Sequence, residues 1–220
     1  MRRLGISVEG ATEREFVNRV LRPHFDQHGI IATGIDLRGN VSLDRIKGVL
    51  PALFGSFDFV ATFYDFYGFK DRGQRTVTQL ETAIAGLTGV DRQMRFFPYL
   101  QQYEFEALLF AAPVQAVDWL GGTARELAAM RKAVAQCGAP ELVNDNAATS
   151  PSHRMKALFP RYDKKLHGPE IIELAGLSAI RAQCPRFDDW ITCLELLGTR
   201  PFPRAINGNS AQAKQRGRCV

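Results

Sequence analysis

Two acidic residues follow apolar runs that are typical of buried strands: Glu9 follows residues 3–8, and Asp65 follows residues 58–64. A carboxylate there needs water, a hydrogen-bond donor or a metal ion, because burying an unpaired charge is costly. Glu9 could simply be an acid near a helix amino terminus, with Gly10 allowing a tight turn, and Asp65 could be an ordinary turn residue. If the two carboxylates meet, they repel each other, and a divalent cation is the usual counter-charge.

The elements that must position these acids alternate between strand and helix. We predict strands at 3–8, 30–37, 58–64 and about 93–100. Helices are expected after a Thr12–Glu15 capping box (with Pro23 as a kink or end), after the N-cap Ser42, at about 75–87 and over 103–111. This alternation predicts an α/β fold with a parallel sheet of about four strands flanked by helices.

Ligands of such sheets bind at the carboxyl ends of the strands. Glu9, Asp65 and the 101–106 segment all lie at such ends, so we expect them at one edge of the sheet.

Beyond Pro113 only helical periodicity is present. We predict helices at 123–136, opened by a Thr123–Glu126 capping box, and near 152–159, 169–176, 177–183 and 187–197, with a loop over 139–153. The expected organisation is an α/β core at 1–112, a helical extension packed on it at 113–198 and a disordered basic tail at 199–220.

The net charge of +5 is concentrated in that tail. Its basic residues are Arg200, Arg204, Lys214, Arg216 and Arg218, and it has no acid. The rest of the chain is therefore near neutral, and the overall charge is only weak evidence for nucleic-acid binding.

Several classes of protein are not supported. No apolar run is long enough to cross a membrane and no signal peptide is recognisable, so we expect a cytoplasmic protein. The four cysteines have no zinc-ligand spacing and are expected to be core thiols, with one in the tail. Phosphate-binding loops, dinucleotide fingerprints, G-x-S-x-G and H-E-x-x-H are absent from the sequence.

Five segments, in order along the chain, resemble the successive motifs of the DUF4276 family, which is counted among the TOPRIM-like proteins. They are VEGATE at 8–13, DFYG at 65–68, YEFEALLF at 103–110, PSHR at 151–154 and CPRFDDW at 184–190. The resemblance covers residues 3 to about 197 and implies that the 1–112 core is TOPRIM-like.

TOPRIM proteins of topoisomerases, primases and nucleases of the overcoming-lysogenization-defect (OLD) type use a glutamate after the first strand and a D-x-D after the third. The resemblance implies that Glu9 is the catalytic acid or base and also a metal ligand. It likewise implies that Asp65 is a catalytic metal ligand for Mg²⁺ or Mn²⁺. The second aspartate of D-x-D is Tyr67 here, so another acid must replace it. Glu104 and Glu106 are the candidates, and the helical wheel does not choose between them. Asp71 is a more remote alternative.

Other motif residues are expected to line the site: Gly10, Thr12, Glu13, Tyr67 and Gly68. A basic stretch over 152–165 could hold phosphate, although a solvated helix face is the more common explanation of such a stretch. The resemblance favours phosphate contacts for Ser152 and Arg154, with Lys156 beside them. Tyr67 and Tyr103 could stack on a base.

These observations predict a divalent-metal-dependent nuclease-like protein that acts on DNA or RNA phosphodiesters. The resemblance implies a link to prokaryotic defence and work beside a partner ATPase. One alternative is a TOPRIM-like binding or regulatory subunit that lacks catalysis because Tyr67 weakens the metal site. Another is a phosphohydrolase or phosphotransfer enzyme that acts on a small phosphorylated substrate.

Overall fold

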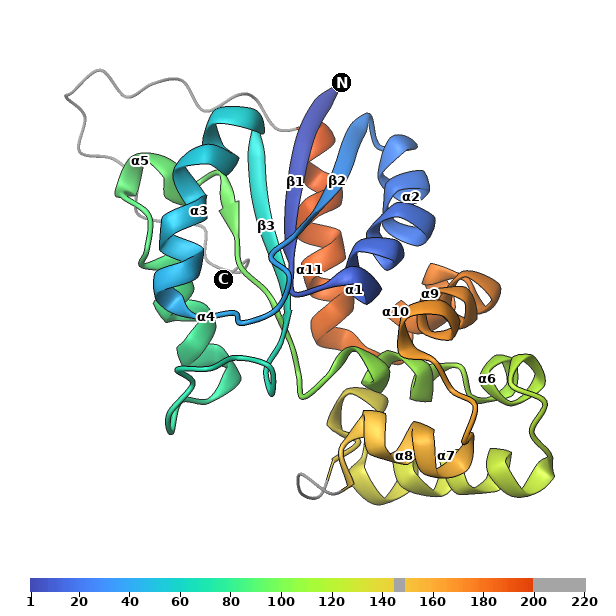
Figure 1. Ribbon diagram of the computed structural model, residues 1–220. Helices are drawn as coiled ribbons and strands as arrows, with labels where there is room; N and C mark the ends of the chain where they lie inside the picture. The colour runs from blue at the N-terminus through green and yellow to red at the C-terminus, as the bar shows by residue number, and fades with distance from the viewer. Residues whose placement is uncertain (145–148, 200–220) are drawn as a thin grey trace.

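The computed structural model describes residues 1–144 and 149–199 and shows an α/β fold around a parallel sheet (Figure 1). The strands are β1 (Arg2–Val8), β2 (Ile30–Asp36), β3 (Phe59–Asp65), β4 (Phe96–Phe97) and β5 (Leu100–Gln101). Their order is β2-β1-β3-β4, and β5 also pairs with β3. All pairings are parallel, which confirms the predicted fold class.

The fourth predicted strand, at 93–100, is wrong in detail. The chain forms α5 (Val90–Gln93) and then two short strands, β4 and β5, separated by Pro98 and Tyr99. Proline has no N–H to donate to a sheet. At this break the Thr62 hydroxyl replaces the backbone ladder, because it donates to the Tyr99 carbonyl at 3.0 Å and accepts from the Tyr99 N–H at 2.9 Å.

Helices cover both faces of the sheet, as an apolar strand like β3 requires. Phe59, Ala61 and Phe63 pack towards α1 (Ala11–Phe16), α2 (Arg22–Asp26) and α11 (Pro185–Glu195). Val60 and Tyr64 point to the opposite face, where they pack with α3 (Leu43–Ser56) and α4 (Val77–Ala85). This alternation within one strand builds two hydrophobic clusters, one on each side (Figure 1).

The first helix begins earlier than its predicted capping box. Its N-cap is Gly10, and the Glu13 carboxylate accepts from the Gly10 N–H at 2.9 Å. The predicted Thr12–Glu15 box is therefore wrong, because the helix starts at Ala11. A π-helical turn, η1 (Val17–Leu21), leads into α2. Pro23 lies inside this continuous helical run, directly after the π-helical turn, and cannot donate a backbone hydrogen bond.

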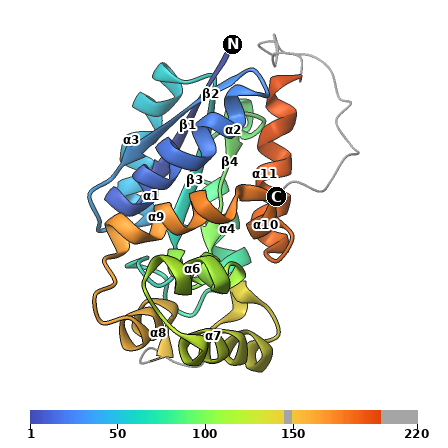
Figure 2. The ribbon, with the colours of Figure 1, turned by 90° about the vertical axis from the view of Figure 1, so that its right-hand side faces the viewer.

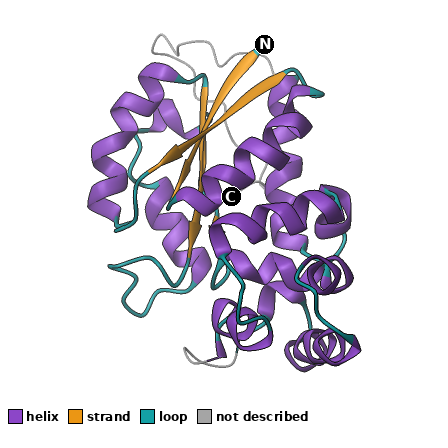
Figure 3. Cartoon of the chain, turned by 45° about the vertical axis from the view of Figure 1, so that its right-hand side comes forward, coloured by secondary structure: helices purple, strands orange, loops and turns teal. Residues whose placement is uncertain are grey.

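The rest of the described chain is mostly helical, and some of its helices lie beyond the carboxyl ends of the strands (Figures 2 and 3). These are η2 (Phe105–Ala111), α6 (Pro113–Trp119), α7 (Ala124–Cys137), η3 (Pro140–Leu142), α8 (Pro151–Leu158), α9 (Lys164–Ala175), α10 (Leu177–Arg181), α11 and η5 (Leu196–Gly198). The caps predicted at Ser42 and Thr123 are present. The helix predicted from 169 begins at Lys164, because Asp163 caps it by accepting from the backbone N–H groups of Lys165 and Leu166. The predicted 139–153 loop contains η3 and the start of α8.

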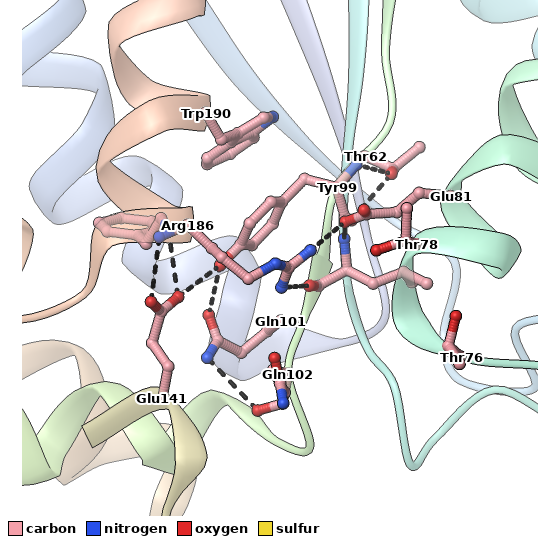
Figure 4. Close-up of polar contacts among 12 residues, drawn as sticks. Thr62, Thr76, Thr78, Glu81, Tyr99, Gln101, Gln102, Glu141, Arg186 and Trp190 are labelled. Carbon is pink, nitrogen blue, oxygen red and sulfur yellow. Dashed lines mark hydrogen bonds and ion pairs between the residues drawn. The ribbon is translucent and has the colours of Figure 1, made fainter. Parts of the chain in front are cut away.

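A buried polar network fastens α11 to the sheet (Figure 4). Arg186 donates to Glu81 of α4 at 2.8 Å and to the Leu100 carbonyl at 3.2 Å. Glu141 accepts from the backbone N–H groups of Arg186 and Phe187, both at 3.1 Å, and so caps α11. The motif at 184–190 thus has a structural role, because it attaches the start of α11 to the sheet.

One hydrophobic cluster includes residues of β1 and β3 together with residues of α7, α8, α9 and α11. The boundary at residue 112 stays a prediction. Neither Cys137 nor Cys184 is in a disulfide, and the predicted tail beyond Thr199, with Cys219, lies outside the described residues. No helix in the described ranges is long and apolar enough to cross a membrane.

Candidate metal centre

Glu9 and Asp65 lie next to each other because β1 and β3 are neighbouring parallel strands. Val8 pairs with Phe63, so the residues that follow the two strands leave the sheet at the same edge. Asp65 is 5 % exposed, and Glu9 is partly buried. The structure therefore brings together the two acids that the sequence pattern placed at strand ends.

Two further glutamates face the same pocket. Glu13 follows one turn into α1, and Glu106 comes from η2, which crosses the ends of the strands. Both are buried, with side chains at 2 % and 0 % exposure. We call Glu9, Glu13, Asp65 and Glu106 the acidic pocket.

Buried oxygens of this pocket have no hydrogen-bond partner among the described residues. They are Oε2 of Glu9, Oδ1 of Asp65 and both carboxylate oxygens of Glu106. An unpaired buried carboxylate is destabilising, so such an oxygen is stabilised by a proton or by a nearby cation.

The pKa values of all four acids in the pocket are raised. Burial raises the pKa of Asp65 well above its usual range, and the neighbouring charges of Glu13 and Glu9 raise it further. Burial is also the largest cause of the raised pKa values of Glu9, Glu13 and Glu106. The fold thus holds four acids where their charged forms are disfavoured, which is typical of a functional site.

Lys164, the first residue of α9, supplies the positive charge nearest to the pocket. Burial alone would lower the pKa of its ammonium group, but the carboxylates of Glu106, Asp65 and Glu13 raise it overall. Tyr162 closes the same side, and burial together with nearby Glu106 raises the pKa of its phenol. A single lysine cannot balance four carboxylates.

The donor set fits Mg²⁺ or Mn²⁺, which are hard cations that prefer carboxylate oxygens and water. Within the described ranges, no three carboxylate oxygens of the pocket lie within 4.8 Å of one another. The pocket is therefore wider than a cage for one dehydrated ion. Mg²⁺ usually keeps several waters and binds through one or two carboxylates and a substrate phosphate, and this width suits such binding.

Gly68 closes the pocket at Glu9. A Cβ atom added at Gly68 would lie 2.2 Å from Glu9 Oε2, so only glycine allows the carboxylate to occupy this position. Gly10, which was expected to line the site, is held by Glu13. Thr12 is buried inside α1.

Tyr67, at the position of the second aspartate, is engaged in contacts other than metal binding. Its hydroxyl accepts from Asn144 Nδ2 at 2.5 Å, and its ring lies 5.2 Å from that of Tyr103. The ring centroids of Phe66 and Tyr67 are 6.1 Å apart, and the Arg72 guanidinium lies over both of these rings. These residues form an aromatic platform of Phe66, Tyr67 and Tyr103 beside the acidic pocket.

The structure separates the two glutamates that the helical wheel left equivalent. Glu106 lies in the pocket, whereas Glu104 Oε2 accepts from the Ser152 backbone N–H at 2.8 Å at the amino end of α8. Asp71 lies on the surface, where it accepts from the Leu43 N–H at 3.2 Å. Of the three candidates, Glu106 therefore has the position of a replacement ligand.

The predicted phosphate-binding residues all lie on α8. Arg154 is half-buried and its Nε donates to the Thr149 carbonyl at 2.8 Å, while Lys156 is exposed. Ser152 connects this helix to Glu104 and thereby to the segment that carries Glu106. A phosphate role for these residues stays a prediction.

Sequence reasoning missed the positions of two residues. Lys164 was counted only as part of a basic stretch, and Glu13 only as a lining residue. Glu13 lies in the first turn of the helix that follows Glu9, so the two acids are close in sequence as well as in space. No comparable local signal exists for Lys164, because α9 reaches the pocket only through tertiary packing against α1.

Comparisons with known proteins agree with this architecture. The model of the family described as "Domain of unknown function (DUF4276)" matches residues 8–195. No curated protein matches the chain.

Among solved structures, the C-terminal region of the Burkholderia pseudomallei OLD protein is similar to this chain. The two have a TM-score of 0.51 and 18 % sequence identity, and the match covers 89 % of this chain and 99 % of that one. This likeness shows the fold, and it agrees with the TOPRIM-like architecture predicted from the sequence.

Proposed function

This chain belongs to the DUF4276 family, and we propose that it is a divalent-metal-dependent, nuclease-like protein acting on nucleic-acid phosphodiesters. The observation that carries the proposal is the acidic pocket. Four carboxylates from three separate segments converge at the carboxyl ends of β1 and β3, with buried oxygens that have no partner in the described chain. Folding such a charge cluster is costly unless a cation is bound there in the working protein.

Each acid has a role that follows from its place. Asp65 and Glu106 would hold the ion, since each is almost fully buried and fixed on a different element, and Glu9 and Glu13 would reach it through bound waters. A divalent ion, when bound, supplies positive charge against the phosphate and the leaving oxygen. Glu9 is the least buried of the four, and its raised pKa suits a group that passes a proton to or from the substrate.

Lys164 is placed to balance the remaining carboxylate charge and to attract phosphate to the pocket. Lys164 as a residue is only partly buried, which would allow it to serve both the neighbouring acids and a substrate. A lysine at such a position acts as a point charge towards phosphate.

The aromatic platform supports nucleic acid, in particular a single strand, as the substrate. Tyr67 and Tyr103 are only partly buried, so a base can reach their rings. The following loop carries Lys70 and Arg75 at exposed positions, where they could contact a backbone of phosphates, while Arg72 lies over the rings of Phe66 and Tyr67.

A partner ATPase and a role in prokaryotic defence are part of the same proposal. The similar solved structure is one region of a longer OLD protein. Because this sequence contains no nucleotide-binding loop, any use of ATP would come from a separate partner. The proposed location is the cytoplasm.

The test is a cleavage assay with single-stranded and double-stranded DNA and RNA, with Mg²⁺ or Mn²⁺ or with a chelator. We expect metal-dependent cleavage that falls by about 100-fold or more in Glu9→Gln and Asp65→Asn. Metal-independent cleavage, or full activity in both variants, would contradict the proposal.

A non-catalytic binding subunit is the second candidate, and Tyr67 is the observation that favours it. Its hydroxyl is engaged by Asn144 where an aspartate ligand is expected. If the protein binds Mn²⁺ and nucleic acid but cleaves neither DNA nor RNA, with or without its partner, this second function replaces the first.

A further inference from the structure

A second cluster of metal-binding side chains lies outside the acidic pocket. His24 Nε2 lies 2.7 Å from Glu195 Oε1, and His28 Nε2 lies 3.8 Å from the same oxygen. The three ligand atoms all lie within 4.8 Å of one another. Of the described residues, only this group brings three potential ligand atoms that close together.

The cluster is at the opposite end of the sheet from the acidic pocket. His28 lies two residues before β2 begins at Ile30, whereas Glu9 directly follows the end of β1. Since β1 and β2 run parallel and each has seven residues, the two sites are about 20 Å apart along the strands. The two clusters therefore share no ligand residue.

The spacing and the chemistry of the ligands both suit a transition metal. His24 and His28 are four residues apart at the end of α2, and their rings lie 5.0 Å apart. A histidine pair with this spacing and one carboxylate is a ligand set for Zn²⁺. Zn²⁺ binds imidazole nitrogen well, whereas Mg²⁺ prefers ligands that are all oxygen. We propose that His24, His28 and Glu195 form a binding site for Zn²⁺ or a similar borderline transition-metal ion.

The carboxylate is already oriented for this role. Arg181 of α10 donates to both oxygens of Glu195 and is itself held by Asp188. Because Arg181 donates to Oε1 as well as Oε2, an ion on Oε1 would replace one of these contacts, while the contact with Oε2 still fixes the orientation of the carboxylate.

The ion can reach the site, and a ligand position remains open. The side chains of His24, His28 and Glu195 are 21 %, 38 % and 17 % exposed. A cavity of about 520 Å³, lined by His24, Arg181 and Asp188, adjoins the cluster. Water can therefore complete the coordination shell.

Metal at this site would join α2 to α11. These helices are more than 150 residues apart in sequence, and they cover the same face of the sheet (Figure 2). A metal bridge between distant segments stabilises the folded state, because an assembled site rarely exists in the unfolded chain.

The test is a Zn²⁺ titration of the full chain, free of any histidine tag and with excess Mg²⁺ present to saturate the acidic pocket. Binding is followed by calorimetry and by the thermal unfolding midpoint. We expect Zn²⁺ to bind the wild type and raise its midpoint. In His28→Ala the affinity should fall at least about tenfold, with the metal-free midpoint unchanged because His28 makes only a distant contact.

Two controls keep the result specific. His153→Ala removes an exposed histidine of α8 and should leave Zn²⁺ binding unchanged. Glu106→Gln alters the acidic pocket and should also leave it unchanged. Equal Zn²⁺ affinity in wild type and His28→Ala, or no Zn²⁺ binding by the wild type, would overturn the proposal without bearing on the nuclease function.

Discussion

Gly68 lies directly against the carboxylate of Glu9, and the space between them leaves no room for a Cβ atom, which would lie 2.2 Å from Oε2. The contacting atoms are the far end of a flexible side chain. A methyl group at residue 68 would therefore displace Glu9 without disturbing the backbone.

We expect Gly68→Ala to lower Mn²⁺ affinity and any metal-dependent cleavage by about 10- to 100-fold, because it moves a pocket carboxylate. The free energy of unfolding should change by less than about 1 kcal/mol. Gly48→Ala is the matched control, since nothing lies within 4 Å of a Cβ atom there. A Gly68→Ala protein with wild-type metal affinity would show that Glu9 does not act at the metal.

Glu104 and Glu106 form a matched pair for identifying the replacement ligand. Glu106→Gln should weaken Mn²⁺ binding by at least about tenfold, measured from the free Mn²⁺ signal in electron paramagnetic resonance. It should also raise the free energy of unfolding of the metal-free protein by on the order of 1 kcal/mol, because an unpaired buried charge is removed. Glu104→Gln keeps an oxygen to accept from Ser152 and should change neither quantity. The reverse ranking would assign the metal to Glu104.

Two substitutions at Tyr67 test separately whether its ring or its hydroxyl contributes to nucleic-acid binding. Tyr67→Ala should weaken binding of a fluorescent single-stranded oligonucleotide by about 1–3 kcal/mol at fixed salt, because a stacking surface is lost. Tyr67→Phe keeps the ring and loses only the contact with Asn144, so we expect a much smaller effect. Trp119→Ala, at a 48 % exposed position of α6, serves as the aromatic control. If Tyr67→Ala binds as tightly as wild type, the platform has only a packing role.

Glu141 predicts a specific dependence of stability on pH. Burial is the largest cause of its raised pKa, which the backbone N–H groups of Arg186 and Phe187 offset only in part. A carboxyl group whose pKa is higher in the folded state contributes most stability below its unfolded pKa of about 4.3, and loses that contribution as pH rises through the folded value. Glutamine does not titrate.

The free energy of unfolding of wild type minus that of Glu141→Gln should therefore fall between about pH 4 and pH 7. Urea denaturation of both proteins at the two pH values measures this difference, and titration of all other groups cancels in it. A difference that grows with pH would mean that hydrogen bonds lower the pKa of Glu141 in the folded state.

The sequence by itself determined the class of fold and one edge of the site. Apolar runs such as 58–64 and helical periodicity are local properties, so they can be recognised before the chain is folded. Parallel strands then oblige Glu9 and Asp65 to leave the sheet at the same edge. The caps at Ser42 and Thr123 were recognised for the same reason, because each depends on residues within one turn.

Only the tertiary structure decided which other groups reach that edge. Glu104 and Glu106 have equivalent positions on a helical wheel, and their roles differ because α8 begins beside one of them while the strand ends surround the other. Lys164 and the His24–Glu195 pair meet their partners across long stretches of sequence. No local pattern encodes such meetings, since burial and electrostatic coupling arise only when separate elements pack together.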